Sequence, residues 1–468
     1  MLATAFPFDL RRCQVLGLTG TAFLALGGET AGALPVRGLF APASAQAALG
    51  LVGVYFGIVL LMAAWLLLGR LVHGPRPPSP RQLVLVLAVW ATPLLLAPPL
   101  FSRDVYSYLA QGAMVDAHMD VYTYGPAHLG GPLADEVAPM WQHTAAPYGP
   151  AFLTVASALS ALTRGELPAG LLGMRLVALL GVALMAAALP RLARHSGAEP
   201  SAALWLGALN PLVLLHLIAG AHNDAIMLGL LGLGLAAAFG RRHLLGAVLI
   251  TLAALVKAPA ALGLLAVVTL RSRSGRHPVA AVVATGAAAV ATTAAATAVA
   301  GTGYGWLRVL DTPVSARNWA LTTLLGRATG ALLDRLGSGL APLALPAWHL
   351  LGLAATVLAT ALIWHRLRPR PVYALGLSLL AVAVLGPAIR PWYVLWGLFL
   401  VAAAAPSTPV RHRVTVLAGV AALAVLPSGD PADPGQLVLA LCGGVLGVVV
   451  LWQAHLSAAQ APATGHTV

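Results

Sequence analysis

Charged side chains are scarce in this 468-residue sequence, where Lys, Arg, Asp and Glu together make up 9 %. Soluble globular chains carry about 25 % charged residues. The shortage therefore excludes a cytosolic enzyme, a disordered chain and a soluble secreted domain. Cysteine is rarer still, with only Cys13 and Cys442, which lie in apolar runs near opposite ends of the chain. They predict no disulfide framework, and neither has the His or Cys neighbours that a metal site needs.

Nucleotide-binding motifs are also missing. The sequence contains no Walker-type loop and no dinucleotide-binding fingerprint. Use of ATP or of a nucleotide sugar is therefore not expected, and we predict no cofactor.

Long apolar runs dominate what is present. A membrane-spanning helix needs about 20 mostly apolar residues, and these runs do not alternate as barrel strands do. They predict an all-α polytopic membrane bundle of about 13–14 transmembrane helices. We place the spans near 13–28, 47–69, 83–101, 170–190, 201–219, 223–239, 243–257, 258–270, 279–300, 343–365, 372–386, 391–405, 412–427 and 436–455.

The net charge of +13 is explained by topology rather than by a nucleic-acid partner. Arginines cluster in alternate connections, and by the positive-inside rule these face the cytoplasm. Both termini are then cytoplasmic, and residues 151–163, too short to cross, form a juxtamembrane helix on the outer face. The basic clusters are Arg11–Arg12, Arg70/Arg76/Arg81, Arg191/Arg194, Arg241–Arg242, Arg271/Arg273/Arg276, Arg366/Arg368/Arg370 and Arg411/Arg413.

The connection 102–169 is predicted to be a long outer loop, and it is rich in aromatic residues beside Gly and Pro. Aromatic rings with polar tips suit sugar recognition, because the ring covers C–H bonds while hydroxyls bond the sugar. An interfacial aromatic belt is the alternative. The residues concerned are Tyr106, Tyr108, Tyr122, Tyr124, Trp141 and Tyr148.

Asp104 follows the predicted span 83–101 directly, at the membrane–water boundary. A carboxylate there can take a proton from an acceptor hydroxyl as a general base. The alternative is an ion pair with Arg103 or a later arginine. Arg175, just inside the span 170–190, is a candidate partner for Asp104 or Glu166.

His222, Asn223 and Asp224 occupy a short turn that the topology places on the same outer side as Asp104. Ionisable residues at membrane depth are functional candidates. The triplet lacks the ligand spacing of a zinc site, so no metal is predicted. A helix cap made by Asn223 or Asp224 is the structural alternative.

Lys257 is the only lysine of the protein and lies inside an apolar run. Its ammonium group needs an anion, either a substrate phosphate or Asp224. Arg390 stands on the outer face beside aromatic residues and suits bidentate phosphate contact. Its alternative is a headgroup-anchored side chain. Arg317 in the outer loop 301–342 is a weaker candidate of the same kind.

These residues resemble the motifs of the GT-C class of integral-membrane glycosyltransferases. The chain is most similar to the actinobacterial polyprenol-phosphomannose-dependent α-1,6-mannosyltransferases that elongate lipomannan-type glycolipids. The resemblance covers about 60 % of the chain, from residue 102 to residue 393. It rests on Ser102–Tyr108 with Ala110–Gly112, Tyr124–Pro126, Trp141, Ala146–Pro150, Asn210–Pro211, Gly220–Asp224, Val256–Pro259 and Arg390–Tyr393.

The resemblance implies an active site on the extracytoplasmic face of a bacterial plasma membrane. Asp104 would be the base, a polyprenyl-phosphate mannose the donor, and a mannan or glycolipid hydroxyl the acceptor, with inversion to an α-1,6 link. Lys257, Arg390 and Arg317 would hold the donor phosphate. Some members of the class use a divalent metal at an Asp-X-Asp motif, which the loop lacks. Contact with sugar or acceptor is expected of Arg103, Tyr106, Tyr108, Gln111, Tyr122, Tyr124, Trp141, Tyr148, His222, Asn223, Asp224, Trp392 and Tyr393.

We expect one polytopic domain followed by a short cytoplasmic tail. In chain order, its parts are two additional spans (1–82), a GT-C-like core (83–270) with the catalytic outer loop 102–169, C-terminal spans (271–455) with the outer loop 301–342, and the tail (456–468).

Two alternatives stay open at this stage. The same lipid carrier can bear arabinose or glucose, and the aromatic loop does not decide among the sugars. A lipid-linked sugar flippase is the second alternative, but a transporter should place its polar residues near the midplane on broken helices. In this sequence they gather at the predicted outer turns.

Overall fold

The computed structural model describes residues 9–35, 44–308, 318–404 and 406–460, and within these ranges every regular element is a helix. The first half of the chain forms α1 (Leu10–Ala31), α2 (Ala45–Val72), α3 (Pro80–Leu96), α4 (Asp104–Asp116), η1 (Pro126–His128), α5 (Gly131–Asp135), η2 (Pro139–Trp141), α6 (Pro150–Thr163), α7 (Leu167–Ser196), α8 (Pro200–Gly207), η3 (Val213–Ala219) and α9 (Asp224–Phe239).

The second half continues in the same way. It forms α10 (His243–Ala254), η4 (Ala258–Leu262), α11 (Gly263–Arg273), α12 (Pro278–Ala300), η5 (Gly305–Leu307), α13 (Leu321–Arg335), η7 (Ala341–Leu343), α14 (Ala344–Leu367), α15 (Pro371–Leu385), η8 (Pro391–Tyr393), α16 (Val394–Ala403), α17 (Thr408–Ala422) and α18 (Pro434–Gln460).

Local sequence explains where many helices begin. Proline is the first residue of α3, α6, α12 and α15, where its fixed φ suits the helix and its missing N–H costs nothing. Before α3, the side chains and backbone of Ser79 and Gln82 form a capping box. Asp9 and Ser44 cap the N-termini of α1 and α2.

The prediction of an all-α polytopic membrane protein is confirmed. Every predicted span overlaps helical residues, although the number of crossings stays a prediction. In the described part of the chain, five helices are long and apolar enough to cross a membrane: α2, α7, α12, the η7–α14 segment and α18. The pair η3 and α9, bent by 109°, would add a sixth span. α3, α10 and α15 are shorter apolar helices.

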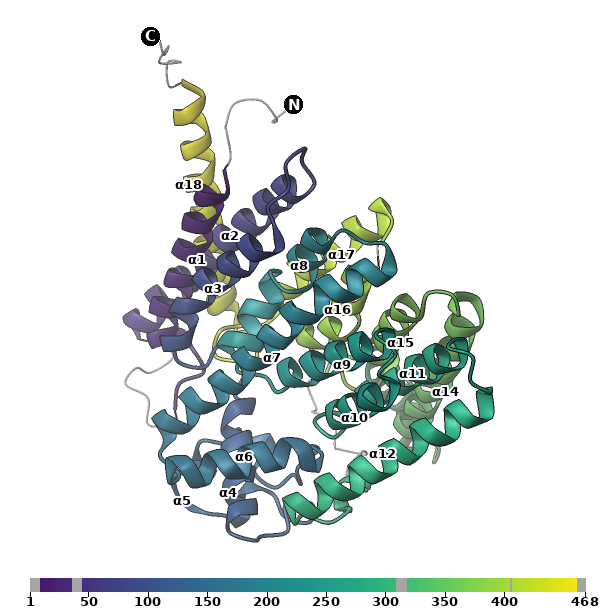
Figure 1. The fold of residues 1–468 in the computed structure, drawn as a ribbon. Helices are drawn as coiled ribbons and strands as arrows, with labels where there is room; N and C mark the ends of the chain where they lie inside the picture. Colours follow the sequence, from purple (N-terminus) through teal and green to yellow (C-terminus); the bar gives the residue numbers. More distant parts are fainter. Residues whose placement is uncertain (1–8, 36–43, 309–317, 405, 461–468) are drawn as a thin grey trace.

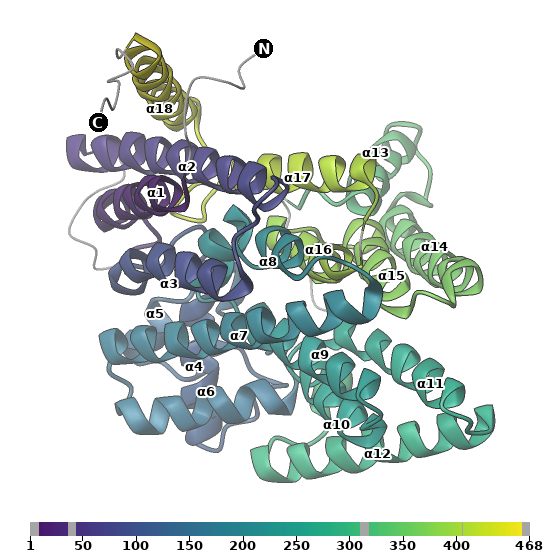
Figure 2. The ribbon, with the colours of Figure 1, turned by 45° about the horizontal axis from the view of Figure 1, so that its top comes forward.

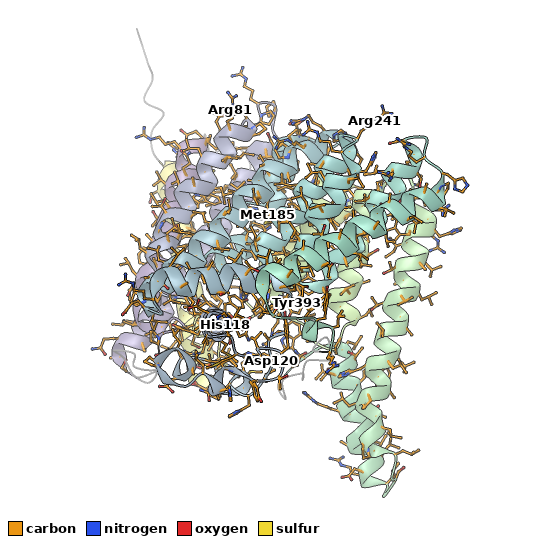
Figure 3. All side chains as sticks on the ribbon, turned by 60° about the horizontal axis from the view of Figure 1, so that its bottom comes forward. Arg81, His118, Asp120, Met185, Arg241 and Tyr393 are labelled. Carbon is orange, nitrogen blue, oxygen red and sulfur yellow. The ribbon has the colours of Figure 1, made fainter. Side chains whose placement is uncertain are left out.

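The helices pack into one body around α7 to α9 (Figure 1). α1 to α3 and α18 lie along one flank, where α18 packs against α2, and α4 to α6 lie together at one end (Figures 1 and 2). In Figure 3, Arg81 and Arg241 lie at one end of the molecule and His118 and Asp120 at the opposite end. Two predicted basic connections and the predicted outer loop 102–169 therefore reach opposite ends, and the assignment of one end to the cytoplasm stays a prediction.

The segment before Asp104 differs from its predicted form. The span expected at 83–101 ends at Leu96, because Pro98 and Pro99 follow, and Asp104 opens the new helix α4. The helix expected at 151–163 is present as α6, and its juxtamembrane position stays a prediction. α13, in the predicted outer loop 301–342, was not foreseen.

Arg175 on α7 fixes this non-helical segment in place. Its guanidinium donates hydrogen bonds to the carbonyls of Leu95 (3.1 Å), Ala97 and Ala219 (3.2 Å). The residue thus binds main-chain carbonyls at the ends of α3 and η3, and the structure gives it no hydrogen bond to Asp104 or Glu166. It joins the end of α3 to the end of η3, which leads into the turn that carries His222.

Candidate active site

A cavity of about 730 Å³ lies in front of the N-terminus of α4. Asp104 opens onto it together with Arg103, Trp141, Arg390 and Trp392, so five predicted site residues from three separate segments share one space. The remaining wall is largely apolar and comes from α2 and from the region between α17 and α18. It includes Tyr55, Leu423, Val425, Leu426 and Leu437.

Asp104 lies in the first turn of α4, where the helix dipole favours a negative charge. Its backbone N–H donates to Ser102 Oγ at 3.1 Å. The side chain keeps a quarter of its surface accessible, on the cavity side. Burial among protein atoms raises the pKa of this carboxyl above its ordinary value, against the opposing fields of the Arg390 and Lys257 cations. A raised pKa in a cleft is typical of a group that accepts and releases protons.

Asp224, which is fully buried, and Lys257, which is largely buried, form an ion pair. Lys257 Nζ donates to both Asp224 carboxylate oxygens, at 3.0 and 2.8 Å. Trp396 Nε1 donates to Asp224 Oδ1 at 2.5 Å. The ammonium group also lies 4.8 Å from the centre of the Tyr393 ring. Of the two anions that the sequence left open for Lys257, the structure provides Asp224.

His222 lies between Asp104 and the Asp224–Lys257 pair. It has no exposed surface, and its Nδ1 is 3.6 Å from Asp104 Oδ2 and 3.3 Å from the Tyr108 hydroxyl oxygen. The imidazole stacks on Trp392 with a centroid distance of 4.0 Å. His222 is therefore a neighbour of the candidate base rather than part of the cavity lining.

Several predicted sugar contacts instead hold the loop together. Tyr106 donates to the Ala33 carbonyl at 2.6 Å, and Tyr122 donates to the Tyr148 carbonyl at 3.1 Å. Arg103 donates to the carbonyls of Leu34 (2.6 Å) and Glu136 (3.0 Å) and lies 3.7 Å from the Glu136 carboxylate, although it also lines the cavity. A sugar-binding role for these side chains stays a prediction.

The remaining predicted residues divide by burial. Gln111 and Asn223 are buried, and Gln111 Oε1 and both amide atoms of Asn223 have no hydrogen-bond partner among the described residues. Tyr124 is 46 % exposed and stacks on His128. Arg317 lies outside the described residues.

Trp319 and Asp430 also line the cavity, although neither is among the predicted site residues. Trp319 stands next to Asn318 in the second outer loop, and Asp430 lies between α17 and α18. No motif marks Asp430. It reaches the cavity because Gly429, with φ +80°, brings its loop against Ser102, whose Cα would lie 3.0 Å from an added Cβ.

Unusual backbone surrounds the candidate base. Phe101 (φ 66°) and Ala221 (φ 51°) adopt left-handed conformations that non-glycine residues rarely occupy. η3, which leads into the His222 turn, is a π-helix, a form that is frequent at functional sites. Such strain persists only where the surrounding structure holds it, and it clusters at active sites. The strained backbone therefore lies in the same region as the candidate site residues Asp104 and His222.

Known proteins resemble this chain over most of its length. A family model described as "Alpha-(1->6)-mannopyranosyltransferase, N-terminal domain" matches residues 14–273, and one described as "MptB C-terminal domain" matches residues 322–453. Alpha-(1->6)-mannopyranosyltransferase A of Mycobacterium tuberculosis is 38 % identical, covering 78 % of this chain and 73 % of the relative.

Two further relatives match almost the whole chain. A probable alpha-(1->6)-mannopyranosyltransferase of Mycolicibacterium smegmatis is 35 % identical, covering 96 % of this chain and 90 % of the relative. Alpha-(1->6)-mannopyranosyltransferase B of Corynebacterium glutamicum is 31 % identical, with 95 % and 82 % covered.

The helical membrane fold and these relatives together define an integral-membrane glycosyltransferase. Within that class, the chain belongs to the α-(1→6)-mannopyranosyltransferase family. The family to which the sequence motifs pointed is thereby confirmed.

Proposed function

We propose that this protein transfers mannose from a polyprenyl-phosphate mannose to the 6-hydroxyl of a mannan or glycolipid acceptor, on the extracytoplasmic side of the plasma membrane. The observation that carries the proposal is that one cavity holds together a carboxylate with a raised pKa, an arginine and tryptophan rings. The names of the relatives supply the sugar and the linkage.

Asp104 acts as the general base. Its carboxylate takes the proton of the acceptor hydroxyl while that oxygen attacks the anomeric carbon and the bond to the donor phosphate breaks. One displacement on a β-linked donor inverts the configuration and yields an α link. Because the side chain is partly open to the cavity, its proton can return to water after each turnover.

Arg390 stabilises the leaving polyprenyl phosphate. It lines the same cavity as Asp104, and its guanidinium lies 6.0 Å from the centre of the Trp392 ring. A planar donor set matches a phosphate in bidentate geometry, and it counts most where negative charge develops. Asp224 neutralises the ammonium group of Lys257. Lys257 therefore affects the electrostatic potential of the site but does not act as a free cation for the phosphate.

Aromatic residues of the cavity wall form the sugar platform. Trp141 on η2 and Trp319 both line the cavity, and their rings can cover the C–H faces of mannose. The apolar wall built by Tyr55, Leu426 and Leu437 suits the isoprenoid end of the donor.

Purified protein in liposomes tests the proposal. We expect mannosyl transfer from polyprenyl-phosphate mannose to a short α-1,6-mannoside, with no transfer from GDP-mannose. Donors that carry arabinose or glucose on the same lipid serve as controls, and the product linkage is determined by methylation analysis. Absence of transfer from every lipid-linked donor would contradict the proposal.

The Arg390→Gln variant should lower kcat about 100-fold, because one donor to a developing negative charge is lost. Arg390→Lys should recover part of the rate, because it keeps the charge without the planar donor set. Arg366→Gln, an exposed arginine at the end of α14, is the matched control. Equal rates for Arg390→Gln and the control would remove Arg390 from the phosphate site.

A further inference from the structure

The His222 ring is more deeply buried than its neighbour Asp104, whose side chain keeps a quarter of its surface accessible. It has no exposed surface, and one face stacks on Trp392 at 4.0 Å with an interplanar angle of 27°. On the other side of its own turn, a Cβ at Gly220 would lie 3.1 Å from His222 Cδ2, so the backbone approaches the ring closely. The left-handed backbone of Ala221 directs the chain into this position. These contacts on both sides of the turn define the position of the ring beside Asp104.

The Nδ1 edge of the His222 ring faces the candidate base Asp104. Nδ1 is 3.6 Å from Asp104 Oδ2, which is longer than a hydrogen bond, and 3.3 Å from the Tyr108 hydroxyl oxygen. The other nitrogen, Nε2, is buried without a hydrogen-bond partner among the described residues. Catalytic hydrogen bonds are often long in the absence of substrate and shorten in the reactive complex.

Burial away from solvent disfavours a positive charge on the imidazole. The titratable and charged groups around it are Asp104 and Tyr108 on α4, His216 on η3, Asp224 on α9, Lys257 after α10, and Arg390 before η8. Lys257 and Arg390 oppose a further positive charge in a site without solvent. A neutral ring carries one proton, and a proton on Nδ1 points toward the Asp104 carboxylate and the Tyr108 oxygen.

We propose that His222 is a positioning residue for Asp104, donating from Nδ1 to Oδ2 so that the other carboxylate oxygen is aimed at the acceptor hydroxyl. The inference rests on the proposed function, because it assigns Asp104 as the base. His222 itself touches no substrate. Its effect is to hold the carboxylate in one orientation and to favour its charged form.

Three His222 variants test this role in the mannosyl-transfer assay. His222→Phe keeps the stacking on Trp392 but has no donor, whereas the amide nitrogen of His222→Asn takes nearly the place of Nδ1. We expect His222→Phe to lower kcat about 10- to 100-fold, which is the loss that follows removal of a residue orienting a metal ligand. The KM for the donor should stay unchanged within twofold. His222→Asn should recover most of the rate. His222→Gln, whose amide nitrogen corresponds to Nε2, should not.

The pH profile and a double variant separate positioning from a merely structural role. Without the donor, the Asp104 carboxylate is less favoured, so the acidic limb of kcat/KM should move to higher pH in His222→Phe. In the Asp104→Asn background, His222→Phe should cause no further loss of rate. If His222→Phe does not fold, the comparison of His222→Asn with His222→Gln carries the same test.

The inference is overturned if the Asn and Gln variants lose equal activity, if the pH profile stays in place, or if the losses of His222→Phe and Asp104→Asn multiply. These results are distinct from failure of the proposed function, in which the unaltered protein transfers no mannose from the lipid-linked donor.

Discussion

Replacement of Asp104 by Asn is expected to lower kcat about 1,000-fold while the protein stays folded. The amide has nearly the same shape but cannot accept the acceptor's proton, and a positioned general base contributes roughly 10²–10⁴-fold. The first position of α4 should accept Asn without unfolding, because the neutral amide carries no charge that the helix dipole would oppose. Transfer is measured by single-turnover mass spectrometry with purified protein, and folding by thermal unfolding in detergent.

Asp116→Asn is the matched control for this variant. Asp116 is the exposed last residue of the same helix and does not line the cavity within the described structure. It should retain full activity. A folded Asp104→Asn protein with more than a tenth of the original rate would contradict the assignment of the base.

The pH dependence of the unaltered enzyme follows from the same residue. The proposed base must be deprotonated to act, so activity should fall as the pH drops through the pKa of Asp104. Burial raises that pKa above the ordinary value for aspartate, and the acidic limb of kcat/KM should therefore lie above about pH 4. In Asp104→Asn this limb should vanish from the residual rate.

Composition and local motifs were sufficient to predict the fold class and the main cavity residues. Apolar runs require helices in a bilayer, whatever the tertiary contacts are, and each run coincides with helical residues. Asp104 and Arg390, polar residues that stand beside apolar runs, line the cavity, and Trp141 lines it from the aromatic loop 102–169.

Contacts with main-chain carbonyls far along the sequence were not predictable. Tyr106 binds the Ala33 carbonyl and Arg103 binds that of Leu34. Because every residue has a main-chain carbonyl, the sequence does not show which one will accept such a hydrogen bond. The end of α3 at Leu96, rather than near Phe101, could have been read from Pro98 and Pro99. The choice between phosphate and Asp224 as the partner of Lys257 needed the three-dimensional arrangement, because both are reasonable anions.

The Asp224–Lys257 pair gives the second large expected effect, on stability. Lys257→Met leaves the Asp224 carboxylate buried with only the Trp396 N–H as a neutral partner. Removal of one partner from a buried ion pair costs about 3–5 kcal/mol. We expect a similar loss in Asp224→Asn, which leaves the lysine charge uncompensated. Thermal unfolding in detergent, followed by tryptophan fluorescence, measures both.

The double variant Lys257→Met/Asp224→Asn should be more stable than either single variant, because no unpaired charge is left. Replacement of a buried pair by neutral groups is often nearly neutral for stability. A double variant that loses the sum of the two single effects would show that the two side chains do not act as a pair. Arg366→Met, at an exposed position, is the control for loss of a cation. Its unfolding temperature should equal that of the unaltered protein.

Activity of the double variant then separates the two roles that the sequence left open for Lys257. Suppose that Lys257 mainly neutralises Asp224, as the distances of 2.8 and 3.0 Å indicate. The folded double variant should then keep transfer within about tenfold of the unaltered rate, because the proposed phosphate ligand Arg390 is unchanged. If the ammonium group leaves Asp224 for the phosphate when the donor binds, the double variant should be stable but as impaired as Arg390→Gln. The geometry favours the first result, since Lys257 Nζ donates to both Asp224 oxygens and lies against the Tyr393 and Trp396 rings.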